Sequence, residues 1–312
     1  MGETRFPHGV SSFGVPILGT TENVIGGDVY WVGATAGSTW LAGVDSPNYG
    51  SKDLPFATID YAVGKCTASN GDVIYVLPGH TETVAVAGGI TVDIAGISII
   101  GLGNGSNRPV ITLSATGSTI AVSGANVTFK NLNIVAGVAE IVSVFNITAA
   151  NCTLDGLYSY PNSTYCIKAF VLTSAAGDDL TIKNCRITQT QAPAATSIFI
   201  KLIGADRCRI MNNEIDVALF DGAGTTLIGG ASTASLNVKI IGNALMIIPT
   251  AGGATLSVIL MYAASTGMIA YNSLALTTAV LAGINNPANC FVNENYITKA
   301  VAKSGILDPV VS

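Results

Sequence analysis

One short pattern recurs along most of this chain and limits what it can fold into. Each copy begins with an aliphatic or aromatic anchor residue, and the anchors stand at positions 99, 129, 154, 182, 210, 240, 269 and 292. Successive anchors are therefore 23 to 30 residues apart. A period of this size is typical of solenoids, in which each repeat packs only against its neighbours.

The residues around each anchor alternate as those of a half-buried strand do. Two residues before the anchor most copies have Ile, Val, Leu or Cys, and five residues after it most have Ile or Leu. Because strand side chains alternate between faces, these residues and the anchor point inward. Two residues after the anchor the first six copies have Gly or Asn, which suit a left-handed corner, and stacked asparagines there can form a hydrogen-bonded ladder. The pattern predicts an all-β, right-handed parallel β-helix of eight or more coils.

The segment before the first copy predicts a cap for this solenoid. Phe56, Ile59 and Val63 fall on one face of a short helix that Gly64 can end. A cap is needed because a terminal coil otherwise exposes core and unpaired strand edges. We expect an extended N-terminal arm with a lead-in strand at 1–45, a capping-helix segment at 46–70 and the β-helix at 71–312.

Composition excludes several function classes. The chain has 312 residues, 11% of them charged, a net charge of −5 and no basic cluster, which argues against nucleic-acid binding. Gly, Pro and Asn interrupt its apolar stretches, so we expect no membrane-spanning helix. The six cysteines lack metal-ligand spacing, and we expect neither a metal nor a cofactor.

Four segments resemble proteins of tailed bacteriophages. Residues 45–50 (DSPNYG), 55–62 (PFATIDYA) and 71–80 (GDVIYVLPGH) resemble the opening of phage-encoded β-helix proteins, which have the pectin-lyase-like fold. Residues 5–10 (RFPHGV) resemble a short N-terminal signature of phage head-associated proteins. The β-helix resemblance covers nearly the whole chain, whereas the arm signature covers six residues.

This resemblance implies a virion structural protein, namely a homotrimeric capsid decoration (cement) protein. It would be made in the host cytoplasm and lie on the outer surface of the phage head, with a second copy of itself and the major capsid protein as partners. The arm has no core of its own, so we expect it to lie on the capsid. The residues expected to contact the capsid are Arg5, Phe6, Pro7, Val10 and Phe13.

The second half of the chain predicts a subunit interface. No charged residue occurs between Ile240 and Glu294. Outward residues there would leave an apolar surface on an isolated solenoid. Three β-helices packed about a threefold axis would bury it, and we expect Ile241, Met268 and Phe291 in that interface.

Candidates for catalysis are sparse. Cleavage of polysaccharides needs paired acids, or acids with a basic group, that converge on one face. The adjacent Asp178 and Asp179 indicate a turn, and Glu214 stands one coil above Arg186, which favours an ion pair. Asp216 and Asp221 form the best remaining acidic pair.

The histidines and tryptophans add no catalytic constellation. His8 and His80 have no nucleophile or acid partner in a triad-like context, and Trp31 and Trp40 are expected to anchor the N-terminal segment. We therefore expect no catalytic residue and no enzymatic activity. The alternatives are a tailspike-like polysaccharide lyase or hydrolase, and a glycan-binding virion module.

Overall fold

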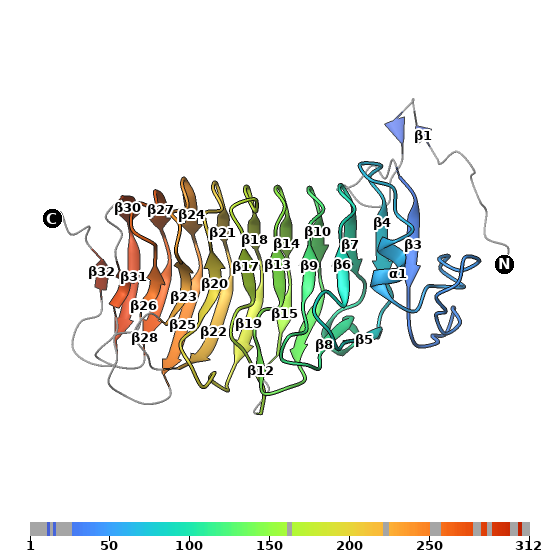
Figure 1. The fold of residues 1–312 in the computed structure, drawn as a ribbon, viewed down its shortest axis with the longest axis horizontal. Coiled ribbons are helices and arrows are strands. Elements are labelled where there is room, and N and C mark those ends of the chain that lie inside the picture. Colours follow the sequence, from blue (N-terminus) through green and yellow to red (C-terminus); the bar gives the residue numbers. More distant parts are fainter. Residues whose placement is uncertain are drawn as a thin grey trace.

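The structure is a computed structural model of the chain. It describes residues 11–12, 15–16, 27–160, 164–220, 225–249, 257–276, 282–285, 289–299 and 305–307. The arm residues Arg5, Phe6, Pro7, Val10 and Phe13 lie outside the described residues. Within them, the chain winds into a right-handed stack of coils that build three long parallel sheets (Figure 1). The predicted fold class is confirmed.

The first sheet carries the repeat that the sequence revealed. Its ten strands are, in spatial order, β3 (Val29–Val32), β4 (Val73–Val76), β7 (Ser98–Gly101), β10 (Thr128–Lys130), β14 (Thr153–Asp155), β18 (Thr181–Lys183), β21 (Arg209–Met211), β24 (Val238–Ile241), β27 (Gly267–Ala270) and β30 (Cys290–Asn293). The eight anchors form one row across it, from Ile99 paired with Phe129 to Ile269 paired with Val292.

The second sheet follows each corner of the first. Its described strands are β5 (Thr81–Val84), β8 (Val110–Leu113), β11 (Asn133–Ala136), β15 (Tyr158–Ser159), β19 (Arg186–Gln189), β22 (Glu214–Leu219), β25 (Ala244–Pro249), β28 (Ser273–Leu276) and β31 (Asn295–Lys299), with β32 (Gly305–Leu307) antiparallel at the end. The inward row predicted five residues after the anchors is confirmed, since Ile134, Ile187, Ile215 and Leu274 are buried.

The third sheet closes each coil (Figure 1). Its described strands are β6 (Ile90–Val92), β9 (Ile120–Val122), β13 (Phe145–Ile147), β17 (Val171–Thr173), β20 (Ile198–Leu202), β23 (Thr226–Gly230), β26 (Ser257–Leu260) and β29 (Ala282–Asn285). Short elements outside the three sheets are the pairs β1 (Ser11–Ser12) with β2 (Val15–Pro16) and β12 (Glu140–Ile141) with β16 (Cys166–Ile167), and the 3-10 turn at Gly105–Asn107. Aromatic rings fill part of the core between the sheets. Phe129 with Phe145 and Phe145 with Phe170 are edge-to-face, and Phe170 with Phe199 is stacked, at centroid distances of 5.2 to 5.9 Å.

The corner between the first two sheets is left-handed, as the Gly and Asn residues predicted. Asn131, Asn184 and Asn212 have φ of 56°, and Gly242 has φ of 69°. The hydrogen-bonded ladder, however, does not form at these positions. Asn131 and Asn184 bond instead to Gly101 and Asp155 of the preceding coil.

The asparagine ladder lies one residue later and inside the solenoid. It consists of Asn213, Asn243, Asn272 and Asn295, all buried. The amide oxygens of Asn243, Asn272 and Asn295 each accept from the backbone and side-chain N–H groups of the preceding asparagine. The Asn213 oxygen accepts from the Cys185 N–H, and each Nδ2 also donates to a backbone carbonyl. The ladder forms there because a left-handed residue turns its side chain outward and the next one points in. Placing the ladder at the corner residue was therefore wrong by one position.

The N-terminal end is covered by the short helix α1 (Ile59–Val63). Thr58 is its N-cap, with its hydroxyl accepting from the Tyr61 N–H. Ile59 and Val63 are buried against the first coils, and Phe56, just before the helix, is buried and packs edge-on against Tyr61. The predicted capping helix is confirmed. In the described residues, no helix has the length and apolarity to cross a membrane.

Three inward cysteines belong to this core. Cys152, Cys185 and Cys208 are free thiols buried between the sheets. Burial raises the pKa of Cys185 and Cys208 to about 12 and that of Cys152 above its usual value. Their burial in the apolar core indicates packing as their role.

Candidate functional site

Polar, charged and aromatic side chains lie close together on the outward face of the second sheet. Register places Tyr158 beside Arg186 and Arg186 beside Glu214, on three adjacent coils. A second outward row beside the first contains Thr188 and Asp216. We call the surface formed by Arg108, Tyr158, Tyr160, Arg186, Glu214 and Asp216 the β15–β22 face.

Tyrosine rings form one end of the β15–β22 face. The centroids of Tyr158 and Tyr160 are 6.2 Å apart, and Tyr160 is 46% exposed. The guanidinium carbon of Arg108 lies 3.3 Å above the centre of the Tyr158 ring. Arg108 also donates from Nε to Asn131 and from Nη1 to the Tyr160 hydroxyl, both at 2.8 Å. These contacts hold the rings in a fixed, partly exposed platform.

Two carboxyl groups form the other end of the face, both on β22. Glu214 lies 3.2 Å from the Nε of Arg186, which confirms the predicted cross-coil ion pair. Asp216 is two residues further along the same strand, so both side chains leave the same side of the sheet. Burial, and secondarily the charge of Glu214, raise the pKa of the Asp216 carboxyl.

The same sheet contains buried side-chain atoms that have no hydrogen-bond partner among the described residues. In the described part of the chain, four buried side-chain atoms have no hydrogen-bond partner: Asn133 Oδ1, Ser197 Oγ, Asp216 Oδ1 and Ser235 Oγ. Two of them, on Asn133 and Asp216, belong to outward rows of the second sheet. Such atoms are rare in folded proteins, so Asp216 stands out among the carboxyl groups of the described residues.

A pocket lies at the far end of β22 from Glu214. Its volume is about 560 Å³, and Glu140, Gln191, Pro193 and Phe220 are among the residues that line it. Phe220 directly follows β22, whereas Glu214 and Asp216 stand near the beginning of that strand and are not among the lining residues. Its size suits a sugar unit or a comparable small group.

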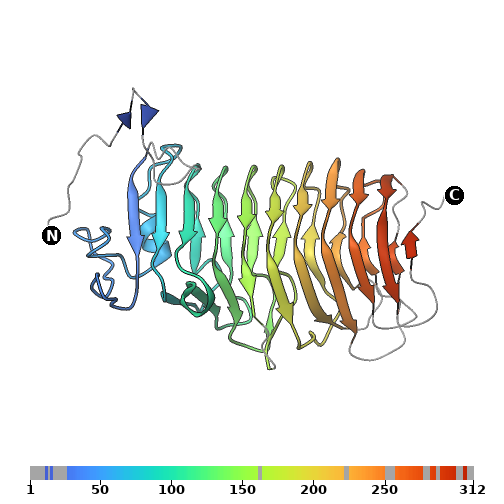
Figure 2. The ribbon, with the colours of Figure 1, turned by 180° about the vertical axis from the view of Figure 1, so that it is seen from behind.

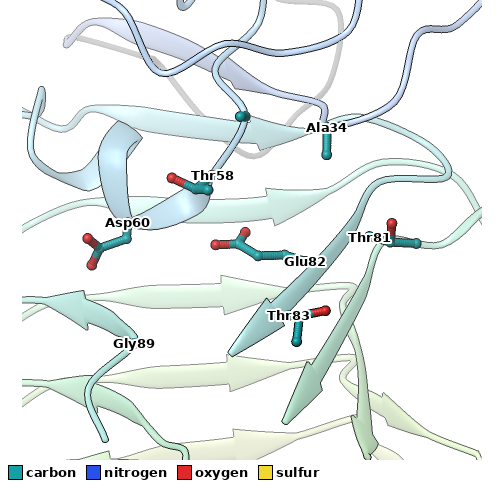
Figure 3. Close-up of a pocket in the computed structure, with 8 residues that line it drawn as sticks. Ala34, Thr58, Asp60, Thr81, Glu82, Thr83 and Gly89 are labelled. Atoms are coloured by element: carbon teal, nitrogen blue, oxygen red, sulfur yellow. The ribbon is translucent and has the colours of Figure 1, made fainter. Parts of the chain in front are cut away.

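A second pocket, at the N-terminal cap, holds two carboxyl groups whose contacts are structural (Figure 3). Its volume is about 400 Å³. Oε2 of Glu82 accepts from the Ile59 N–H and from Nε2 of His80, whose Nδ1 accepts from the Ala34 N–H. Asp60 accepts from the Thr91 N–H. These bonds fasten the helix and the lead-in strand to the first coils, which explains His80 without a catalytic role.

The remaining sequence candidates are dispersed. Asp178 and Asp179 both pair with Arg207, and Asp179 has φ of 57°, as the predicted turn requires. The Arg207 guanidinium lowers the pKa of Asp179. Trp31 packs on Tyr75 with centroids 5.0 Å apart, in the N-terminal segment where an anchor was expected. Asp221, the predicted partner of Asp216, lies outside the described residues, as does His8.

The predicted interface residues lie on the outer surface of the first sheet. Met268 and Phe291 are neighbours in one outward row, and Phe291 is 64% exposed. Ile241 lies partly exposed in the adjacent row, and Lys239 continues the row of Met268. The apolar surface that the sequence predicted is therefore present, next to one lysine.

Sequence reasoning missed Arg108, Tyr158 and Tyr160. Arg108 belongs to the segment between β7 and β8, where the first coil departs from the repeat, so no column contained it. A signal existed in the second sheet, because Tyr158 is the residue just before the inward row in its coil, as are Arg186 and Glu214. Following the column of Arg186 and Glu214 back by one coil would have added Tyr158.

Comparison with known proteins finds similarity at the level of solved structures. No protein-family model matches the sequence, and no curated protein does. A rhamnogalacturonan lyase is 16% identical with a TM-score of 0.47, over 86% of this chain and 87% of that one. The pectin methylesterase from Aspergillus niger, in deglycosylated form, is 16% identical with a TM-score of 0.49, over 88% and 94%. The GH136 lacto-N-biosidase from Eubacterium ramulus is 11% identical with a TM-score of 0.37, over 86% and 67%.

These similarities agree with a pectin-lyase-like β-helix and correct one expectation. We expected no enzymatic activity, yet the similar structures are, by name, carbohydrate-acting enzymes. The non-enzymatic interpretation is therefore wrong as it stood and is not retained. At these identities and TM-scores no activity and no residue role is transferred, so the function has to be argued from the β15–β22 face itself.

Proposed function

We propose that this protein is a polysaccharide hydrolase that binds its substrate along the β15–β22 face. One observation carries the proposal: Asp216, a carboxyl group with a raised pKa, stands on the same side of one strand as the ion-paired Glu214. Perturbed titratable groups of this kind cluster at functional sites. Two carboxyl groups with different environments are also what acid–base cleavage of a glycosidic bond requires.

The two acids take different roles because their surroundings differ. Asp216 holds its proton to higher pH and donates it to the glycosidic oxygen as the bond from that oxygen to the anomeric carbon breaks. A water molecule attacks the anomeric carbon and passes one proton to Glu214. Arg186, 3.2 Å from Glu214, orients this carboxylate. Tyr160, which is 46% exposed, offers a ring on which a neighbouring sugar unit stacks, and Tyr158 and Arg108 hold that ring in place.

The spacing of the acids predicts the stereochemistry. The Cα atoms of Glu214 and Asp216 are about 6.6 Å apart along the strand, and carboxyl groups that leave the same side of a strand in parallel keep about this separation. Carboxyl pairs of inverting glycosidases stand about 6.5 to 9.5 Å apart, whereas retaining pairs stand about 5.5 Å apart. We therefore expect products of inverted anomeric configuration, which proton NMR of the first product formed detects.

The proposal is tested by the release of reducing ends from a panel of polysaccharides: dextran, carboxymethyl-dextran, alginate and bacterial capsular polysaccharide. We expect Asp216→Asn and Glu214→Gln each to lower the cleavage rate by about 100-fold or more. Asp93→Asn, an exposed carboxyl group beyond the end of β6, is the matched control and should keep the wild-type rate. No cleavage by the wild-type protein, or equal rates in all variants, would contradict the proposal.

The phage resemblance supports the biological setting of this proposal. A tailspike-like hydrolase is a virion protein that degrades a surface polysaccharide of the host, and the expected homotrimer suits that setting equally well. The trimer, the capsid contact and the virion location stay predictions. The exposed Phe291 and its neighbour Met268 are what supports a contact between copies of the chain.

A further inference from the structure

We infer that Arg108 is a specificity residue that binds an anionic group, a carboxylate or sulfate, on the polysaccharide. The inference rests on the proposed function, because it assigns a substrate class to the β15–β22 face. It concerns a residue outside the acid pair and predicts a preference that hydrolysis alone does not require.

Arg108 is a buried cation without an ion-pair partner among the described residues. Arg108 is 7% exposed, yet no carboxyl group in the described part of the chain forms an ion pair with it. Arg186 and Arg207, by contrast, face carboxylates. A buried charge without a counter-ion is costly. The Tyr158 ring face offsets part of that cost, but a ring does not replace an anion.

The guanidinium of Arg108 uses only part of its hydrogen-bond donors within the protein. Nε is used by Asn131 and Nη1 by Tyr160, which leaves Nη2 without an acceptor among the described residues. Nη2 is also absent from the fully buried unpartnered atoms, so it reaches solvent. Arg108 therefore presents a fixed, charged donor at the surface of the tyrosine platform. Planar oxyanions are the acceptors that a guanidinium binds best.

Arg108 lies at the tyrosine end of the β15–β22 face, away from the two acids. Arg108 lies over Tyr158, and Tyr158 is separated from Glu214 by two inter-strand steps, about 10 Å. The anionic group would thus sit on a sugar unit beside the cleaved one, away from the negative Glu214. The chain as a whole has a net charge of −5, so general electrostatic attraction does not favour a polyanion. A preference for anionic glycans would need a local cation, and Arg108 is placed to supply it.

The test compares three polymers with one backbone: dextran, carboxymethyl-dextran and dextran sulfate. Binding is measured by calorimetry with full-length Asp216→Asn protein, so that cleavage does not interfere. We expect at least tenfold tighter binding of one or both charged polymers than of dextran, and the two charged arms distinguish carboxylate from sulfate. Adding Arg108→Gln should abolish the preference, whereas Lys239→Gln, which removes an exposed cation on the first sheet, should not.

Equal binding of all three polymers, no binding of the charged ones, or a preference that survives Arg108→Gln would overturn the inference. Because Arg108→Gln also removes a packed group, thermal midpoints are recorded, and Tyr160→Phe serves as a second variant. Tyr160→Phe frees Nη1 and should keep the preference, so its loss there counts against Arg108 as the binding group. A protein that shows the preference but cleaves no glycan refutes the hydrolase and leaves the role of Arg108 standing.

Discussion

The pKa of a carboxyl group in this solenoid depends on the contacts that its position provides. The pKa of Asp216 is raised and that of Asp179 is lowered. Asp179 faces Arg207, which lowers its pKa, whereas burial beside Glu214 raises the pKa of Asp216. Both residues are aspartates in turns or strands of the same solenoid. Sequence columns identify such residues, but only their contacts decide which one keeps a proton.

The raised pKa of Asp216 gives stability a definite pH dependence. The folded protein binds this proton more tightly than the unfolded chain, so stability falls as pH rises from the unfolded pKa, about 3.9, through the higher folded pKa. We expect Asp216→Asn, which is neutral at every pH, to raise the midpoint of thermal unfolding at pH 7 and to leave it nearly unchanged at pH 3.5. Differential scanning fluorimetry at both pH values measures this, and an equal shift at both would contradict the assignment.

At the scale of the element, the asparagine ladder joins four coils through side chains. The Asn243 side chain donates to Ile210 and Asn272 and accepts twice from Asn213. Asn243→Ala would leave several buried polar groups unpartnered, at a cost of about 3 kcal/mol or more in the free energy of unfolding. Denaturant titration measures this cost. Asn104→Ala, an exposed asparagine whose side chain makes no capping bond, should change stability by less than about 0.5 kcal/mol.

Some of these strands and contacts were predictable from the sequence alone, and others were not. The first sheet and the inward row of the second were predictable because their strands keep fixed distances from each anchor, and the Glu214–Arg186 pair followed from the same columns. The ladder was misplaced by one residue, since side-chain direction at a left-handed corner is a backbone property. The contact of Arg108 with Tyr158 was beyond reach, because it joins an irregular segment to a strand two coils away.

At the scale of the whole molecule, the coils stack along one axis, with β3 near one end and β30 and β31 near the other (Figure 2). Met268 and Phe291 are outward apolar neighbours on the first sheet, and Phe291 is 64% exposed in a single chain. We expect a homotrimer, with three times the 31.7 kDa of one chain in sedimentation equilibrium at micromolar concentration. Phe291→Asp should shift the mass toward the single chain. A wild-type monomer under these conditions would contradict the predicted interface.

Alkylation of the buried thiols would report local opening of the solenoid. Cys152, Cys185 and Cys208 lie near successive strands of the first sheet, and with a pKa of about 12 the latter two are thiolate in roughly one molecule in 10,000 at pH 8. An alkylating reagent therefore finds them almost inert while the coils stay closed. Each thiol becomes reactive when its own coil separates from the next, so the order of labelling would trace the path along which the stack comes apart.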